Sequence, residues 1–97
     1  MKAVMIIYNM ALTEKVEFTL EHFKLRGYTQ WENVKGVGST AGMPHLGTHT
    51  WPEINGVLLT FVDDNKVEPL LEAVRRIDAI NKEVGVRAFV WEIQQTV

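Results

Sequence analysis

Two segments of the chain, residues 2–8 and 54–62, are apolar on both faces of an extended strand. A strand with one face in water would alternate apolar and polar side chains, so these two must be covered on both sides or lie centrally in a sheet. Residues 28–35 alternate more weakly and are polar on one side, which is typical of an outer strand. Residues 86–93 close the chain as a fourth strand. The sequence therefore predicts a sheet whose first and third strands are central.

Two helices are predicted between these strands, because apolar residues recur there at helical spacing. The core stripes are Val16, Leu20 and Phe23 in the first helix and Leu70, Val74, Ile77 and Val84 in the second. We expect the first helix to begin at an N-cap, Thr13, and to end at Gly27. We expect the second helix to begin at a cap among residues 63–65 and to end at Gly85.

The order of these elements predicts an α+β domain of ferredoxin-like βαββαβ architecture, with a four-stranded antiparallel sheet and both helices on one face. The 97 residues are enough for one domain, residues 1–97, and too few for two. The face of the sheet without helices would expose Val, Ile, Phe and Trp side chains. Because a large apolar patch on a small protein indicates an interface, we predict self-association through this face.

Composition excludes several classes of protein. The net charge is −2 and the ten basic residues are scattered, which argues against a nucleic-acid partner. The absence of cysteine excludes disulfides, thiolate metal sites and cysteine nucleophiles. No apolar stretch approaches the roughly 20 residues that span a bilayer, and the first residues lack the features of a signal peptide. We therefore expect a cytoplasmic protein that is not embedded in a membrane.

The segment from Gly36 to Glu53 is the part of the chain whose composition calls for a functional explanation. It contains four glycines, two prolines and two histidines, and it is long for a loop. The small residues 36–42 follow a strand and would let backbone N–H groups approach an anion closely, with the hydroxyls of Ser39 and Thr40 assisting. A flexible turn without a ligand is the alternative.

His45 and His49 lie within this loop and form a candidate metal site. Two neutral imidazoles four residues apart can bind one divalent transition metal such as zinc, copper or nickel when the loop folds back. A third ligand would come from Glu53, from the carboxylates of residues 63–64 or from a neighbouring subunit. The alternatives are that both histidines are solvated, or that His49 is held by packing under Trp51.

An enzyme is the least favoured interpretation. The chain has no cysteine nucleophile, no glycine-flanked elbow serine and no Ser-His-Asp order of a known kind. The candidates to line a pocket are three aromatic residues and a histidine: Trp31, His45, Trp51 and Trp91. Since no residue is assigned as a nucleophile or a base, we predict a protein without catalytic residues.

The chain resembles the PII-like signalling proteins over nearly its whole length. The resemblance rests on the first strand Lys-Ala-Val-Met-Ile-Ile, a helix followed by Gly27, a second strand ending in Val34-Lys35-Gly36-Val37-Gly38, a long loop, and an apolar strand and helix. It implies a ferredoxin-like homotrimer whose sheets pack together in the middle, which would cover the open face. It also implies a regulatory protein that binds an adenine nucleotide in the clefts between subunits.

The resemblance assigns ligand-binding roles residue by residue. Gly36 and Gly38, with Ser39 and Thr40 beside them, would lie against the nucleotide. The turn Gly85-Val86-Arg87 looks like a reduced form of the family's phosphate-binding turn, with Arg87 replacing a lysine. The loop Gly36–Trp51 would be the effector loop that touches partners such as membrane transporters; it has no tyrosine, which excludes tyrosine modification there. The loop histidines make the chain similar to small PII-like or CutA-type relatives associated with metal or ion handling.

Overall fold

The structure is a computed structural model that describes residues 1–37, 44–50, 53–82 and 84–97. Its elements, in chain order, are β1 (Lys2–Asn9), a 3₁₀ turn η1 (Met10–Leu12), α1 (Thr13–His22), β2 (Tyr28–Val34), β3 (Asn55–Val62), α2 (Asp64–Ile80) and β4 (Val86–Glu92). The predicted βαββαβ order is therefore confirmed.

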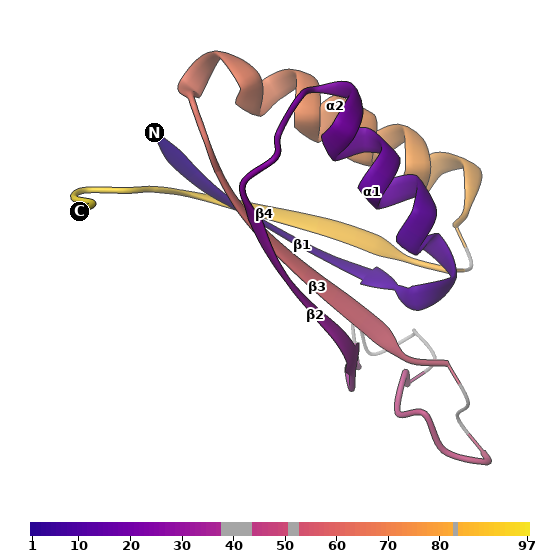
Figure 1. Ribbon diagram of the computed structural model, residues 1–97. Helices are drawn as coiled ribbons and strands as arrows, with labels where there is room; N and C mark the ends of the chain where they lie inside the picture. Colours follow the sequence, from indigo (N-terminus) through magenta and orange to yellow (C-terminus); the bar gives the residue numbers. More distant parts are fainter. Residues whose placement is uncertain (38–43, 51–52, 83) are drawn as a thin grey trace.

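The four strands form one antiparallel sheet in the order β2-β3-β1-β4. The two strands that are apolar on both faces, β1 and β3, are the central ones, as the sequence predicted. Both helices lie on the same face of the sheet (Figure 1). Among the described residues, no helix has the length and hydropathy that crossing a bilayer requires.

The core lies between the helices and the inner face of the sheet. Its largest fully buried side chains include Tyr8, Ile6, Leu20, Leu58 and Leu70. Each of the aliphatic side chains among them contributes about 1.5–3 kcal/mol by its removal from water. Alternate residues of β1 provide this core, so the residues between them face the opposite side.

The opposite face of the sheet carries an apolar surface, which we call the open face. It is built in cross-strand rows: Phe61–Ala3–Trp91, Leu59–Met5–Phe89 and Trp31–Val57–Ile7. Four of its aromatic side chains are about half exposed in the isolated chain: Trp31, Phe61, Phe89 and Trp91. This agrees with the expectation of a large apolar patch on the side without helices.

The predicted start of the first helix was wrong. Thr13 does not cap α1 from outside; it is the first helical residue, and its Oγ1 donates a hydrogen bond to the Met10 carbonyl oxygen at 2.6 Å. The cap belongs instead to the preceding turn, where Asn9 Oδ1 accepts from the Ala11 amide at 2.9 Å. Asparagine is a strong competitor for this role because its short side chain reaches the backbone two residues on.

The predicted end of the first helix at Gly27 was also wrong. The helix ends at His22, and Lys24 adopts the left-handed conformation with φ of 58°. The Leu25 amide then donates to the Leu20 carbonyl at 2.9 Å, which is the closing hydrogen bond of a Schellman motif. A lysine occupies the position that glycine usually takes, so the motif could not be located from composition.

The second helix keeps its predicted start but is shorter at its end. Asp63 occupies the N-cap position without a capping hydrogen bond from its side chain. The Asp64 carboxylate pairs with the Met1 amino group at 3.0 Å and with Lys2 Nζ at 3.4 Å. The helix ends at Ile80 because Asn81 leaves the helical conformation, with φ of −121° and ψ of 48°. The side chain and amide of Asn81 both donate to the Ile77 carbonyl at this end.

Candidate functional site

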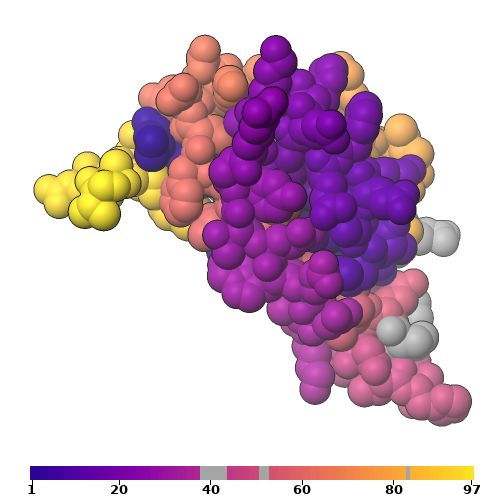
Figure 2. Space-filling model, in the orientation of Figure 1, coloured from indigo at the N-terminus to yellow at the C-terminus, as the bar shows by residue number. Residues whose placement is uncertain are grey.

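One end of each of the four strands lies at the same end of the sheet, and the long loop between β2 and β3 starts and finishes there. Asn9 ends β1 opposite Asn55, which begins β3, and Val34 at the end of β2 is also paired with Asn55. The Asn9 amide donates to the Gly85 carbonyl, just before β4, at 3.1 Å. Residues 44–50 project from this end of the molecule, and the C-terminal residues project from the other (Figures 1 and 2). The predicted ligand-binding residues Gly36 and Arg87 therefore belong to the same end.

A bulge at the end of β2 directs the chain into the loop. The register with β3 shifts between Trp31 and Val34, and Asn33 adopts a left-handed φ of 56°. Asparagine tolerates this conformation better than other non-glycine residues, and bulges bend and twist the strand that carries them. The bulge is thus the local reason for the course of the chain towards Gly36.

Gly36 makes a tight backbone contact with the far arm of the loop. Its amide donates to the His45 carbonyl at 2.8 Å, and the His45 amide donates back at 2.6 Å. A Cβ at position 36 would collide with the side-chain amide of Asn55. The group that lies against this glycine here is Asn55, and the predicted role of Gly36 in ligand binding remains a prediction.

The His45 side chain joins a polar network that the sequence did not predict. The imidazole is only 15% exposed, and its Nδ1 lies 2.5 Å from Asn55 Oδ1. Its Nε2 lies 3.3 Å from Glu53 Oε2, which also accepts a hydrogen bond from Asn9 Nδ2 at 2.7 Å. The only signal in the sequence was the pair of asparagines that end one apolar strand and begin another. The network ties the loop to the two central strands.

The predicted metal site is not supported by this geometry. Among the residues that the structure describes, no three His, Asp or Glu side chains form a group that could hold a metal ion. Both ring nitrogens of His45 already face the oxygens of Asn55 and Glu53, while His49 is exposed. Glu53, expected as a third metal ligand, instead has its Oε2 facing Nε2 of the ring.

Some predicted residues lie outside the described part of the chain. These are Gly38, Ser39 and Thr40 among the ligand-binding candidates and Trp51 among the pocket candidates. Their predicted roles remain predictions.

Arg87 lies on the opposite edge of the sheet from Gly36. Arg87 lies on the edge strand β4, where it pairs with Ile7 of β1. Gly36 follows β2, the strand at the other edge of the sheet. Three strand spacings separate the two edges, or roughly 14 Å. The Arg87 side chain is 70% exposed, and its Nη1 pairs with Asp78 of α2 at 3.1 Å. One chain therefore offers the two predicted halves of a ligand site on separate edges.

Comparison with known proteins identifies the family. The family model for nitrogen regulatory protein P-II matches residues 1–97. This chain belongs to the P-II family. P-II proteins are regulatory signalling proteins and not enzymes, in agreement with the predicted absence of catalytic residues. No curated protein matches the sequence significantly.

Solved structures of PII-like proteins share the fold of this P-II chain. CPII from Thiomonas intermedia K12 bound to ADP and bicarbonate is 25% identical, with 95% of this chain and 84% of that chain covered and a TM-score of 0.74. The same protein bound to ADP, AMP and bicarbonate is 24% identical over 99% of this chain and 92% of that chain, also with a TM-score of 0.74. A Thermus thermophilus protein described as PII-like is 22% identical over 93% of this chain and 83% of that chain, with a TM-score of 0.65.

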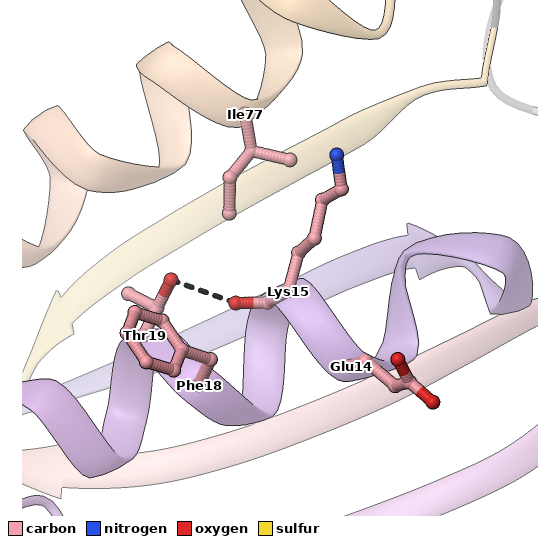
Figure 3. Close-up of a pocket in the computed structure, with 5 residues that line it drawn as sticks. All are labelled: Glu14, Lys15, Phe18, Thr19 and Ile77. Atoms are coloured by element: carbon pink, nitrogen blue, oxygen red, sulfur yellow. Dashed lines mark hydrogen bonds between the residues drawn. The ribbon is translucent and has the colours of Figure 1, made fainter.

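The P-II chain also has a shallow groove between its two helices. It is lined by Glu14, Lys15, Phe18, Thr19 and Ile77 (Figure 3). The Thr19 hydroxyl donates to the Lys15 carbonyl at 2.8 Å, so that its polar atom is already used within α1. The groove presents mainly apolar surface and lies on the helical layer, whereas the candidate site lies at the end of the sheet.

Proposed function

We propose that this P-II protein is a sensor that binds an adenine nucleotide in clefts between the subunits of a homotrimer. In this proposal residues 1–97 act as one PII-like domain in the cytoplasm. The loop Gly36–Trp51 responds to the ligand and contacts a regulated partner, such as a membrane transporter. Binding at a cleft next to this loop is a suitable signal, because a ligand that prefers one loop conformation shifts the population towards it.

The observation that carries the proposal is the separation of Gly36 and Arg87 on opposite edges of one sheet. Two copies of the chain placed side by side would bring the Gly36 edge of one next to the Arg87 edge of the other. The glycine segment would then supply backbone N–H groups to the ligand, and the guanidinium would supply two or more donors to a phosphate.

The open face gives a reason for such an assembly. Four half-exposed aromatic side chains on one side of a small sheet need a cover, and packing three sheets together provides it. A homotrimer is also what the resemblance to the PII-like signalling proteins implies. The CPII structures with bound ADP support the choice of an adenine nucleotide as the ligand.

Isothermal titration calorimetry with ATP, ADP and AMP tests the proposal. We expect saturable binding of at least one of them by the wild-type protein, with one site per chain. The phosphate-binding role of Arg87 is tested with the variant Arg87→Ala. Absence of heat for all three nucleotides at millimolar concentration would contradict the proposal.

A further inference from the structure

The side chain of Asn55 contacts both arms of the long loop at the point where they meet the sheet. The backbone of Gly36, just after β2, pairs with the backbone of His45 on the returning arm through hydrogen bonds of 2.8 and 2.6 Å. One end of the Asn55 amide lies against Gly36, and Oδ1 at the other end lies 2.5 Å from His45 Nδ1. A single side chain therefore touches both residues of this backbone bridge.

The backbone of Asn55 is held by the sheet and not by the loop. The residue begins β3 and is paired with Asn9 of β1 on one side and with Val34 of β2 on the other. It is only 9% exposed, and the carbonyl of the preceding residue, Ile54, accepts a hydrogen bond from the Met10 amide at 2.9 Å. The central strands thus fix the place from which this short side chain reaches the bridge.

The Asn55 amide accounts for the glycine at position 36. A Cβ built on Gly36 would collide with this amide, and apart from the neighbours of Gly36 in the chain no other described residue lies within 4 Å of that Cβ. The φ of Gly36 is not positive, so its backbone conformation would accept an alanine. The two ends of a planar amide are nearly equal in size, so the collision is the same whichever end carries the nitrogen.

We infer that Asn55 is a positioning residue that fixes the backbone of Gly36 against the sheet, and that Asn55, not a ligand, requires the glycine at position 36. The N–H and C=O of Gly36 are both used in the bridge with His45, so Gly36 anchors the segment that follows it. The effect of Asn55 on nucleotide affinity rests on the proposed function, whereas its packing against the bridge does not.

Hydrogen exchange of the Gly36 and His45 amides reports on the bridge, since each donates to the other residue's carbonyl. In Asn55→Ala we expect the protection of both amides to fall about tenfold, the effect of losing one well-made hydrogen bond. In Gly36→Ala we expect a loss at least as large, because the new methyl group displaces the amide from His45. In the double variant the methyl group enters space that Asn55 has vacated, so protection should equal that of Asn55→Ala within about twofold.

Calorimetric titration with ADP on the same variants shows whether Asn55 or the ligand requires the glycine. We expect Asn55→Ala to weaken binding about tenfold, because the Gly36 backbone is no longer held in place. Adding Gly36→Ala to Asn55→Ala should then cost no further affinity. A ligand that itself occupied this space would make Gly36→Ala equally harmful in both backgrounds, which would overturn the inference.

Thr60→Val is the matched control. Thr60 lies on the same strand and is buried, and its Oγ1 donates a hydrogen bond to the Gly27 carbonyl at 2.8 Å. The substitution removes one buried hydrogen bond at nearly constant volume, so it should lower the free energy of unfolding and leave both the bridge amides and the ADP affinity unchanged. If Asn55→Ala fails to fold, Asn55→Ser takes its place in both measurements, since its side chain lacks the Nδ2 atom that a Cβ at position 36 would meet.

Three further results would contradict one proposal or the other. Bridge amides without measurable protection in the wild type, or with unchanged protection in Asn55→Ala, would overturn the packing role. Lost protection in Asn55→Ala with wild-type ADP affinity would overturn the positioning role. Absence of ADP binding by the wild-type protein contradicts the proposed function alone, because the exchange measurements need no ligand.

Discussion

The ring of Tyr8 occupies the space that a side chain at position 56 would need. Tyr8 and Gly56 are directly opposite each other on β1 and β3, and a Cβ built on Gly56 would lie 2.6 Å from Tyr8 Cζ. The ring is almost completely buried, and its hydroxyl accepts a hydrogen bond from Gln30 Nε2 at 2.7 Å. Burial raises the pKa of the Tyr8 hydroxyl above its ordinary value of 10.0. The absence of a side chain at position 56 is therefore a packing requirement of the core.

We predict that Gly56→Ala destabilises the protein by about 1–3 kcal/mol, the usual cost of overpacking a core. The measurement is the free energy of unfolding in urea, at one fixed protein concentration because oligomers unfold in a concentration-dependent way. Gly27→Ala is the matched control: nothing lies within 4 Å of its added Cβ, so it should be neutral or stabilising by up to about 1 kcal/mol. Equal losses in the two variants would contradict the packing argument.

The ion pairs of Asp64 predict how one part of stability depends on pH. The Met1 amino group and Lys2 together lower the pKa of the Asp64 carboxyl from its ordinary value of 3.8. A lowered pKa in the folded state means that the contribution is fully present above pH 3.8 and is lost as the pH falls through the folded-state value. The melting temperature of Asp64→Asn should thus be slightly below that of the wild type at neutral pH. The difference should shrink below about pH 4, whereas a constant difference would contradict the assignment.

The open face predicts the effect of a charge on assembly. Phe89→Asp would bury a carboxylate against apolar surface in any oligomer formed through this face, at a cost of several kcal/mol. Light scattering coupled to size exclusion should show a wild-type mass of about 33 kDa, three times the chain mass of 11.1 kDa, and a monomeric variant. Phe18→Asp, on the helical layer and 67% exposed, is the control and should leave the wild-type mass unchanged. Dissociation by Phe18→Asp alone would place the interface on the helices instead.

Substitutions of Arg87 and of its partner Asp78 should differ in their effects on nucleotide binding. Arg87→Ala removes a charge-assisted contact to phosphate and should weaken binding at least tenfold. Asp78→Ala frees the guanidinium from its ion pair and should leave the affinity unchanged or raise it a few-fold. Calorimetric titration with ADP gives both values. Wild-type affinity in Arg87→Ala would remove this residue from the site.

The sequence predicted the order and arrangement of the strands and helices well, but it predicted poorly the residues at which the helices begin and end. Residues 2–8 and 54–62 are apolar on both faces, and this property alone identified the central strands. The helix ends were wrong because several polar residues compete locally for the same backbone groups. Asn9 takes the capping role expected of Thr13, and Lys24 takes the left-handed position expected of a glycine.

The candidate site was predictable only in part, for a similar physical reason. Gly36 was singled out as a candidate for ligand binding, whereas the group that lies against it in the structure is the side-chain amide of Asn55, which is distant in sequence. His45 was identified as a candidate metal ligand. Its partners Asn55, Glu53 and Asn9 come together only through the register of β1 with β3, which no local pattern encodes. Ring nitrogens available for a metal and ring nitrogens already hydrogen-bonded look the same in a sequence.

Native mass spectrometry of the purified protein, with and without added adenine nucleotide, tests the central claim most directly. We expect a trimer that gains up to three nucleotide masses, one for each cleft that threefold symmetry creates. A monomer, or a trimer that takes up no nucleotide at millimolar concentration, would contradict the proposed function.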